Sequence, residues 1–360
     1  MQSPGTRLLD ESEAAANRSG KIKWFLRLML GILVVGILVR WQGDNVGNAL
    51  RNTSPLTLVL AVFAYLSTQF ISALRWRLLL NAAVRAHNTR NLPPLGVWES
   101  YRLYLIGMFC NLWLPTAIGG DAVRAAMATK HSGNLALAAT SIFVERLTGL
   151  TALLAIGVIG MFAYFGTSSA GGQSGQAQAV SIAGIAIAVL VAMVVFIWLL
   201  RKIAWRISTR ENSSKLAQKF VGVHQAFDVY FTPATRPALI GALALSLLFQ
   251  SSHIVLNIFL ARSVGLDLPT QVFIWLIPCL GIASMIPLGV GGLGVREAGA
   301  VAFLNGALPA GAMPEPGTII AWSLLWQAML WISGLPGALA YFGSGFKGGK
   351  ASAPPPDPTD

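Results

Sequence analysis

Long apolar runs fill most of this 360-residue chain, and they limit it to a membrane fold. Each run approaches the roughly 20 residues that an α-helix needs to cross a bilayer. Only 11% of the residues are charged, against about 25% in a soluble protein. The candidate spans are residues 22–41, 56–75, 142–165, 179–200, 238–261 and 318–342, and further apolar runs cover 97–118 and 271–290. The sequence therefore predicts an all-α, polytopic integral membrane protein.

One pattern occurs twice, at residues 115–124 and 287–296. The first copy runs from Pro115 to Arg124 and the second from Pro287 to Arg296, and both read P-x3-G-G-x2-V-R after an apolar run. Pro removes a backbone donor, so it breaks a helix. A repeated break of this kind predicts a transporter built from two related halves. We place the halves at about 21–178 and 179–342, after a polar cytoplasmic N-terminus (1–20) and before a disordered C-terminal tail (343–360).

The distribution of basic residues predicts the orientation of the chain. Segment 75–96, the N-terminus and loop 201–237 are rich in Lys and Arg and are expected on the cytoplasmic side, whereas loop 166–178 has no charge and is expected outside. An odd number of crossings must separate 75–96 from 166–178, so one of the two runs between them does not cross. We interpret 97–118 as a re-entrant hairpin that enters from the cytoplasm. A second hairpin, formed by 271–290 and 298–308, is expected from outside, which would make the halves inverted.

The two motif copies are candidates for one anion site. A helix that restarts after Gly119-Gly120 or Gly291-Gly292 offers free amides at a positively polarised N-terminus, which binds anions. Arg124 and Arg296 are expected about one turn into these helices, and guanidinium binds phosphate through paired hydrogen bonds. The alternative is that the glycine pairs form ordinary tight turns and the arginines reach the lipid headgroups. The helix breaks themselves are assigned to Pro115 and Pro287.

Other ionisable residues lie in or beside the apolar runs. Asp121, Glu145, Arg146 and Glu297 are candidates for coupling to protons or for ion pairs, because unpaired charge at membrane depth is costly. A structural pair of Glu145 with Arg146 is the alternative. The sequence Arg75-Trp76-Arg77 is expected to anchor a span at the interface. No spacing of Cys, His or acidic residues indicates a metal site or a cofactor, and no catalytic group is predicted.

Several of these segments together resemble a known family. They are Leu74–Arg77 (L-R-W-R), Asn111–Pro115 running into Gly119–Arg124, Val144–Arg146 with Gly149-Leu150, and Pro287 through Glu297. The combination resembles the transmembrane (flippase) domain of the lysylphosphatidylglycerol synthase family and its free-standing relatives, over roughly residues 20–342. The resemblance implies a membrane protein that moves or handles lipids with polar headgroups. Some free-standing members are associated with hopanoid or isoprenoid-linked lipid pathways. The chain ends at Asp360 without a soluble synthase domain, so we do not expect synthase activity.

From these features we expect a flippase-like transporter, not an enzyme, in the cell membrane with a cytoplasmic N-terminus. Its partners are expected to be anionic, phosphate-containing membrane lipids, and candidates for protein partners are a second copy of the chain or a lipid-synthesis enzyme. The net charge of +12 is assigned to cytoplasmic loops and contact with anionic lipid, not to nucleic acid. The alternatives are a lipid-modifying membrane enzyme, a permease for a soluble anion, and an accessory subunit of a lipid-synthesis pathway.

Overall fold

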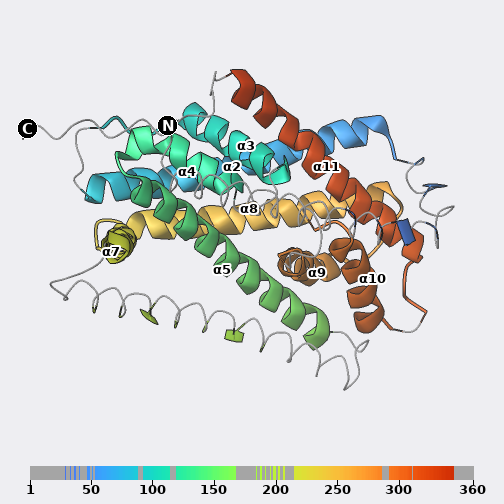
Figure 1. The fold of residues 1–360 in the computed structure, drawn as a ribbon. Helices are drawn as coiled ribbons and strands as arrows, with labels where there is room; N and C mark the ends of the chain where they lie inside the picture. The colour runs from blue at the N-terminus through green and yellow to red at the C-terminus, as the bar shows by residue number, and fades with distance from the viewer. Residues whose placement is uncertain are drawn as a thin grey trace, which may run out of the picture.

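The computed structural model is helical throughout the part of the chain that it describes (Figure 1). It describes residues 53–87, 92–113, 119–167, 215–285, 292–309 and 311–343, with single positions between 29 and 51 and between 184 and 206. Apart from those single positions, the predicted spans 22–41 and 179–200 lie outside the described residues, as do the polar N-terminus and the tail beyond Gly343.

Four long helices form the frame and confirm four of the predicted spans. They are α2 (Pro55–Ala86), α5 (Leu135–Thr167), α8 (Arg236–Ser263) and α11 (Pro316–Gly343), each long and apolar enough to cross a membrane. Helices α2 and α8 lie side by side and antiparallel (Figure 1), and the Thr53 hydroxyl donates to the carbonyl of Ser263 where α2 begins and α8 ends. The frame therefore has one end where α2 stops and α5 and α8 begin, and an opposite end where α8 stops and α11 begins.

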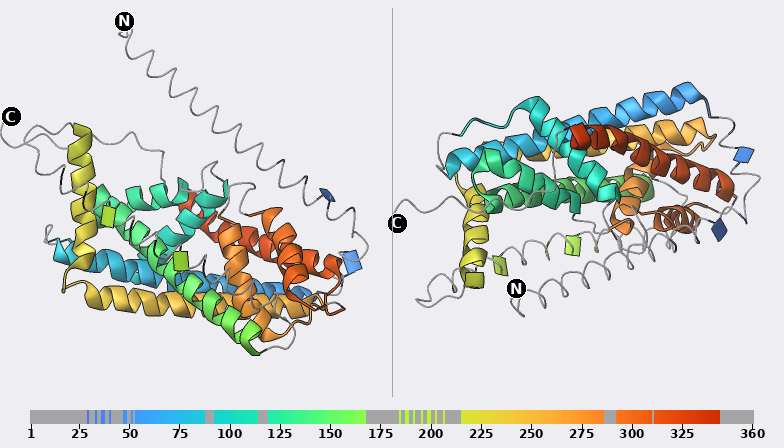
Figure 2. Two further views of the ribbon diagram at one scale, coloured as in Figure 1. Left: turned by 90° about the horizontal axis from the view of Figure 1, so that it is seen from below. Right: turned by 45° about the horizontal axis from the view of Figure 1, so that its top comes forward.

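Two pairs of short helices complete the bundle. The first pair is α3 (Val97–Trp113) with α4 (Gly119–Ser132), which pack on each other, and the second is α9 (Thr270–Ala283) with α10 (Val295–Ala307). The first pair starts after α2 and ends just before α5, so it opens at the end where α2 stops. The second pair starts after α8 and ends just before α11, so it opens at the opposite end (Figure 2).

A short amphipathic helix lies across the first end of the frame. It is α7 (Lys215–Asp228), followed by a 3-10 turn η2 (Val229–Phe231), and Figures 1 and 2 show α7 nearly perpendicular to α8. Phe227 and Tyr230 are buried, while Val223 and Phe231 are exposed. The Tyr230 hydroxyl donates to the carbonyl of Leu79, so η2 is fixed against α2.

Buried apolar side chains form two cores, one around each helix pair. One core joins α3 and α4 to the C-terminal half of α2 and the start of α5, and the other joins α9 and α10 to the second half of α8 and the first half of α11. Buried polar residues lie on the frame helices between the two cores. This polar layer contains Thr68, Gln69, Ser72 and Arg75 on α2, Glu145 on α5, Ser246 and Gln250 on α8, and Ser333 on α11.

Candidate functional site

The polar layer is centred on the Glu145 carboxylate, which is fully buried. Its Oε1 accepts a bond from Arg75 Nη2 at 2.7 Å and its Oε2 accepts one from Arg124 Nη2 at 2.5 Å. Arg75 also donates through Nη1 to the Ser246 hydroxyl at 3.0 Å, and the Tyr104 hydroxyl donates to Oε1 at 3.3 Å. Glu145 thus ties α2, α3, α4, α5 and, through Arg75, α8 to one point inside the bundle.

Arg124, a predicted headgroup ligand, is enclosed by this arrangement. Its side chain is 2% exposed, and its guanidinium lies 4.7 Å from the ring centres of both Trp76 and Tyr104. Helix α4 can approach α3 so closely because Gly120 has no side chain. A Cβ at Gly120 would collide with the Gly107 carbonyl and lie 2.7 Å from the Asn111 side chain.

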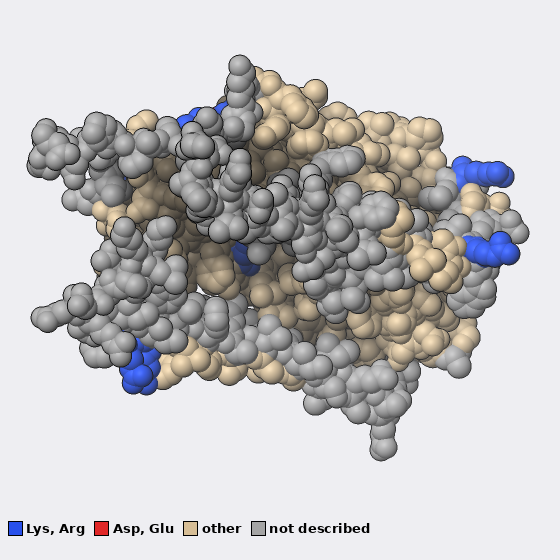
Figure 3. Space-filling model, viewed as in Figure 1, with Lys and Arg blue, Asp and Glu red and all other residues tan. Residues whose placement is uncertain are grey.

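Asp121 and Arg146 form a second ion pair one step away. Arg146 Nη2 and Nε donate to the two carboxylate oxygens of Asp121 at 2.9 and 3.2 Å. Asp121 also lies 3.8 Å from Arg124. The Arg146 side chain is 53% exposed, whereas that of Asp121 is 17% exposed. Figure 3 shows a basic side chain in a hollow in the middle of the face where α4 and α5 lie side by side.

The second motif copy is built differently. Arg296 is buried, donates through Nη1 to the Gln327 side chain at 2.9 Å, and lies 4.2 Å from the ring centre of Trp326. Glu297 accepts from the Gly294 amide at 2.7 Å and from the Ser323 hydroxyl at 3.1 Å. It therefore caps the start of α10 and fixes α10 to α11.

The end of α3, just before the first motif copy, and Arg296 of the second copy both contact α11. Leu112, near the end of α3, packs directly on Gly334 of α11, and Arg296 binds Gln327 of the same helix. Seven residues of helix separate these contacts, about 10 Å along its axis. The end of α3 and the start of α10 therefore lie in neighbouring parts of one interior.

Several details of the predicted site are wrong. Arg75 is not a cytoplasmic loop residue or an interfacial anchor, because α2 continues through it to Ala86 and buries it against Glu145. Glu145 and Arg146 do not pair with each other, since adjacent positions on α5 point to different partners. Arg296 is the second residue of α10, not one turn into it.

The glycine pairs also differ from the prediction. Gly119 and Gly120 already belong to α4, and the Gly120 amide donates to Asn111 Oδ1 at 2.8 Å. Gly292 and Gly294 lie in a turn before α10, with φ of 85° and 84°. At both sites a protein side chain therefore occupies one of the amides expected to bind an anion. Pro115, Pro287 and Gly291 lie outside the described residues.

The sequence reasoning missed the roles of Tyr104, Gln327 and Ser246, which hold the charged residues. Their signal was weak, because single polar residues in apolar runs are common in helix packing. His253 has such a packing environment, with aromatic rings of Tyr65, Phe249 and Trp326 within 6.0 Å of its ring centre. Gln250 donates to the carbonyl of Gly149 and joins α8 to α5.

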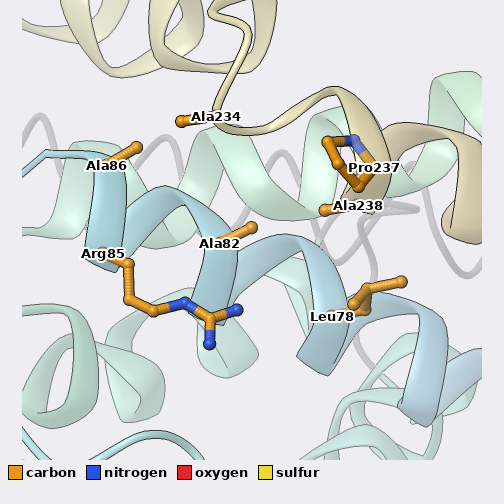
Figure 4. Close-up of a pocket in the computed structure, with 7 residues that line it drawn as sticks. All are labelled: Leu78, Ala82, Arg85, Ala86, Ala234, Pro237 and Ala238. Carbon is orange, nitrogen blue, oxygen red and sulfur yellow. The ribbon is translucent and has the colours of Figure 1, made fainter.

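A separate pocket lies at the end of the frame between α2 and the start of α8. Figure 4 shows its lining residues, among which Arg85 is charged and none belongs to the motif copies: Leu78, Ala82, Arg85, Ala86, Ala234, Pro237 and Ala238. Within the described ranges, no group of three or more His, Cys, Asp or Glu side chains is placed to hold a metal ion. Cys110 is buried, Cys279 is partly buried, and both are free thiols.

Comparison with known proteins gives one result that covers most of the chain. The profile of the lysylphosphatidylglycerol synthase TM region matches residues 24–337, which includes both motif copies and every helix pair described above. No curated protein matches the chain. The match, the apolar helices and the residues shared with that family lead to one conclusion: the chain belongs to the lysylphosphatidylglycerol synthase transmembrane family and is a polytopic helical membrane protein.

Proposed function

We propose that the protein is a flippase-like transporter that binds a lipid by an anionic, phosphate-containing headgroup and moves it across the cell membrane. The observation that carries the proposal is that the end of α3, just before the first motif copy, and Arg296 of the second copy both contact the middle of α11. A site built from two related segments that enter from opposite ends is the arrangement expected of an alternating-access transporter.

The lengths of the short helices support two inverted halves. Helices α3 and α4 have 17 and 14 residues, and α9 and α10 have 14 and 13. None reaches the roughly 20 residues required to cross a bilayer. Each pair is therefore interpreted as a re-entrant hairpin, one from the cytoplasmic side and one from outside. Non-helical backbone at this depth is tolerated where protein covers it or water fills a cavity.

The charges of the interior favour an anionic headgroup. Four arginines of the interior, Arg75, Arg124, Arg146 and Arg296, face three carboxylates, those of Asp121, Glu145 and Glu297. Helices α4 and α10 also begin in this region, and their N-termini add partial positive charge. The surplus of positive charge supports phosphate as the chemical group that is bound.

The exposure of Arg146 supports a route for such a lipid. In this proposal the headgroup reaches Arg146 while the acyl chains stay in the bilayer, beside the exposed apolar faces of the frame. Exposed Leu335, Leu339 and Phe342 on α11 are examples of such a face. The lipid then needs no channel wide enough for its tails.

The test is translocation of headgroup-labelled phosphatidylglycerol in proteoliposomes. Wild type is expected to move the lipid faster than empty liposomes, and Arg296→Gln is expected to reduce the rate at least about tenfold, because it removes a charge-assisted contact worth about 1.5–3 kcal/mol. Arg262→Gln is the matched control, since Arg262 is exposed at the end of α8. No movement above empty liposomes for any anionic lipid, or equal rates for all three proteins, would contradict the proposal. Chemical conversion of the added lipid would favour an enzyme instead.

A further inference from the structure

Five charged side chains form an alternating chain through the first half of the bundle. The order is Arg75, Glu145, Arg124, Asp121 and Arg146, and the closest distances between successive members are 2.7, 2.5, 3.8 and 2.9 Å. We call this set the ionic chain. It begins on α2, passes between α5 and α4, and returns to α5.

The two ends of the ionic chain differ in access. At the Arg75 end the guanidinium is buried, donates to Ser246 and lies 5.6 Å from the ring centre of Phe249. At the Arg146 end about half of the side chain is exposed. Only the Arg146 end can therefore accept another group without displacing a helix.

The ionic chain carries one uncompensated positive charge. It has three guanidinium groups and two carboxylates, and each carboxylate already lies between two arginines. Excess charge in a low-dielectric interior is costly, and the cost falls when a counter-ion binds. One negative charge at Arg146 would continue the alternation and bring the total to zero. Two negative charges would leave the same region with a net charge of −1.

Asp121 has a specific part in this balance. It occupies Arg146 through both carboxylate oxygens, so a bound phosphate must share that guanidinium with it. Arg124 lies 3.8 Å away on the same helix and can accept Asp121 when the phosphate approaches Arg146. The carboxylate stays close to the bound headgroup in either position, and its repulsion grows with the charge of that headgroup.

The second motif copy lacks this competitor. Leu293 stands where Asp121 stands in the first copy, and the oxygens of Glu297 are used by Gly294 and Ser323. We therefore assign the selectivity between anions of different charge to the first motif copy.

We propose, building on the function above, that Arg146 binds a headgroup phosphate with a single negative charge and that Asp121 sets this preference. The site takes a phosphodiester, as in phosphatidylglycerol, in preference to a doubly charged phosphomonoester, as in phosphatidic acid. Arg146 contacts the phosphate, and Asp121 is the specificity-determining residue.

Equilibrium binding to the purified full-length protein tests this assignment without requiring transport. Fluorescent phosphatidylglycerol is displaced by unlabelled phosphatidylglycerol, phosphatidic acid, phosphatidylcholine or soluble glycerol phosphate at pH 8, where a phosphomonoester with a second pKa of about 6 is a dianion. Wild type is expected to prefer phosphatidylglycerol over phosphatidic acid by about tenfold or more. Arg146→Gln is expected to weaken phosphatidylglycerol about 10- to 100-fold, the range of a charge-assisted bond.

Asp121→Asn gives the decisive comparison, because it raises the charge of the ionic chain by one. It is expected to remove the preference for phosphatidylglycerol or to reverse it, with no loss of phosphatidylglycerol affinity. Lys130→Gln, which removes an exposed cation outside the ionic chain, is expected to bind like wild type. Size-exclusion profiles and melting temperatures check that each variant is folded. If Arg146→Gln is unstable, Arg146→Lys replaces it in the test; this variant keeps the charge and should retain part of the affinity for phosphatidylglycerol.

The outcomes separate the two proposals. Unchanged selectivity in Asp121→Asn, or wild-type affinity in Arg146→Gln, overturns the assignment of this site even if translocation is observed. If binding is selective as predicted but no translocation occurs, the proposed function is overturned, while the assignment of the binding site to Arg146 and Asp121 stands. Equal affinity for glycerol phosphate and phosphatidylglycerol would identify a site for soluble anions. It would overturn both the proposed lipid transport and the proposed lipid headgroup at Arg146.

Discussion

Replacing Glu145 by glutamine removes one negative charge from the most buried part of the ionic chain and changes its shape little. Arg75 and Arg124 are then left at side-chain exposures of 5% and 2% without the carboxylate that each contacts. Breaking a buried ion pair on one side costs about 3–5 kcal/mol, because the remaining charge is uncompensated. Asp121, at 3.8 Å from Arg124, offsets part of this loss, so we expect about 3–5 kcal/mol in total and not twice that value.

The assay is thermal unfolding of the purified protein in one detergent, followed by circular dichroism. At about 2–4 °C per kcal/mol, the melting temperature of Glu145→Gln should fall on the order of 10 °C. Glu99→Gln is the control. Glu99 also accepts bonds from Arg102 at 2.8 Å and lies 3.2 Å from Lys130, but its side chain is 26% exposed. Exposed pairs contribute about 0–1 kcal/mol. Equal melting temperatures for the two variants would refute the reasoning that the buried pair joins the helices.

Two further predictions concern the first helix pair. Gly120→Ala should lower the free energy of unfolding by about 1–3 kcal/mol, because the added Cβ collides with the backbone of Gly107 and forces α4 away from α3. Gly166→Ala is the control and should be neutral, since no atom lies within 4 Å of the added Cβ. Equal effects of the two substitutions on thermal unfolding would contradict the close approach of α3 and α4. The pKa of Glu99 falls from 4.5 to about 2 because Arg102 donates to its carboxylate. Its contribution to stability is therefore complete above pH 4.5 and lost as the pH falls toward 2. Melting temperatures measured against pH should show a smaller acid loss in Glu99→Gln than in wild type, and parallel curves would rule this contribution out.

The frame could be predicted from the sequence because hydropathy and helix length depend on local composition. The four spans that the structure describes begin and end within one to eleven residues of the predicted ends, and the largest difference is at the end of α2. The basic residues of segment 75–96 predict the start of a cytoplasmic loop at this position. The segment from Trp76 to Ala86 contains no Pro or Gly, so nothing in it ends the helix, and Arg75 finds its counter-charge on α5 instead of in water.

The partners inside the site could not be predicted in the same way. Arg75 binds Glu145 and Ser246, which lie 70 and 171 positions away in sequence. Hydropathy identifies a buried face of a helix, but it does not say which residues of two helices will oppose each other. The sequence therefore indicated that Glu145 and Arg146 needed partners, and only the packing of α2, α4 and α5 assigns them.

One difference between the motif copies explains why their helices start at different positions. Gly294 occupies the position of Ala122 in the first copy. Gly294 has a φ of 84°, which ends the turn and delays the start of α10 to Val295, whereas Ala122 lies inside α4. A left-handed conformation is readily available to glycine and costly for alanine. The two arginines thus begin their helices at different positions although the motifs match.

The end of α3 lies against the middle of α11, the helix that also binds Arg296. Disulfide formation tests it directly, in a background where Cys110 and Cys279 are replaced by alanine. Leu112→Cys with Gly334→Cys should cross-link rapidly under mild oxidation in native membranes, because these positions are in contact. Leu112→Cys with Gly343→Cys, about 13 Å further along α11, should not. Failure of the first pair to form, or equal yields from both pairs, would contradict the account.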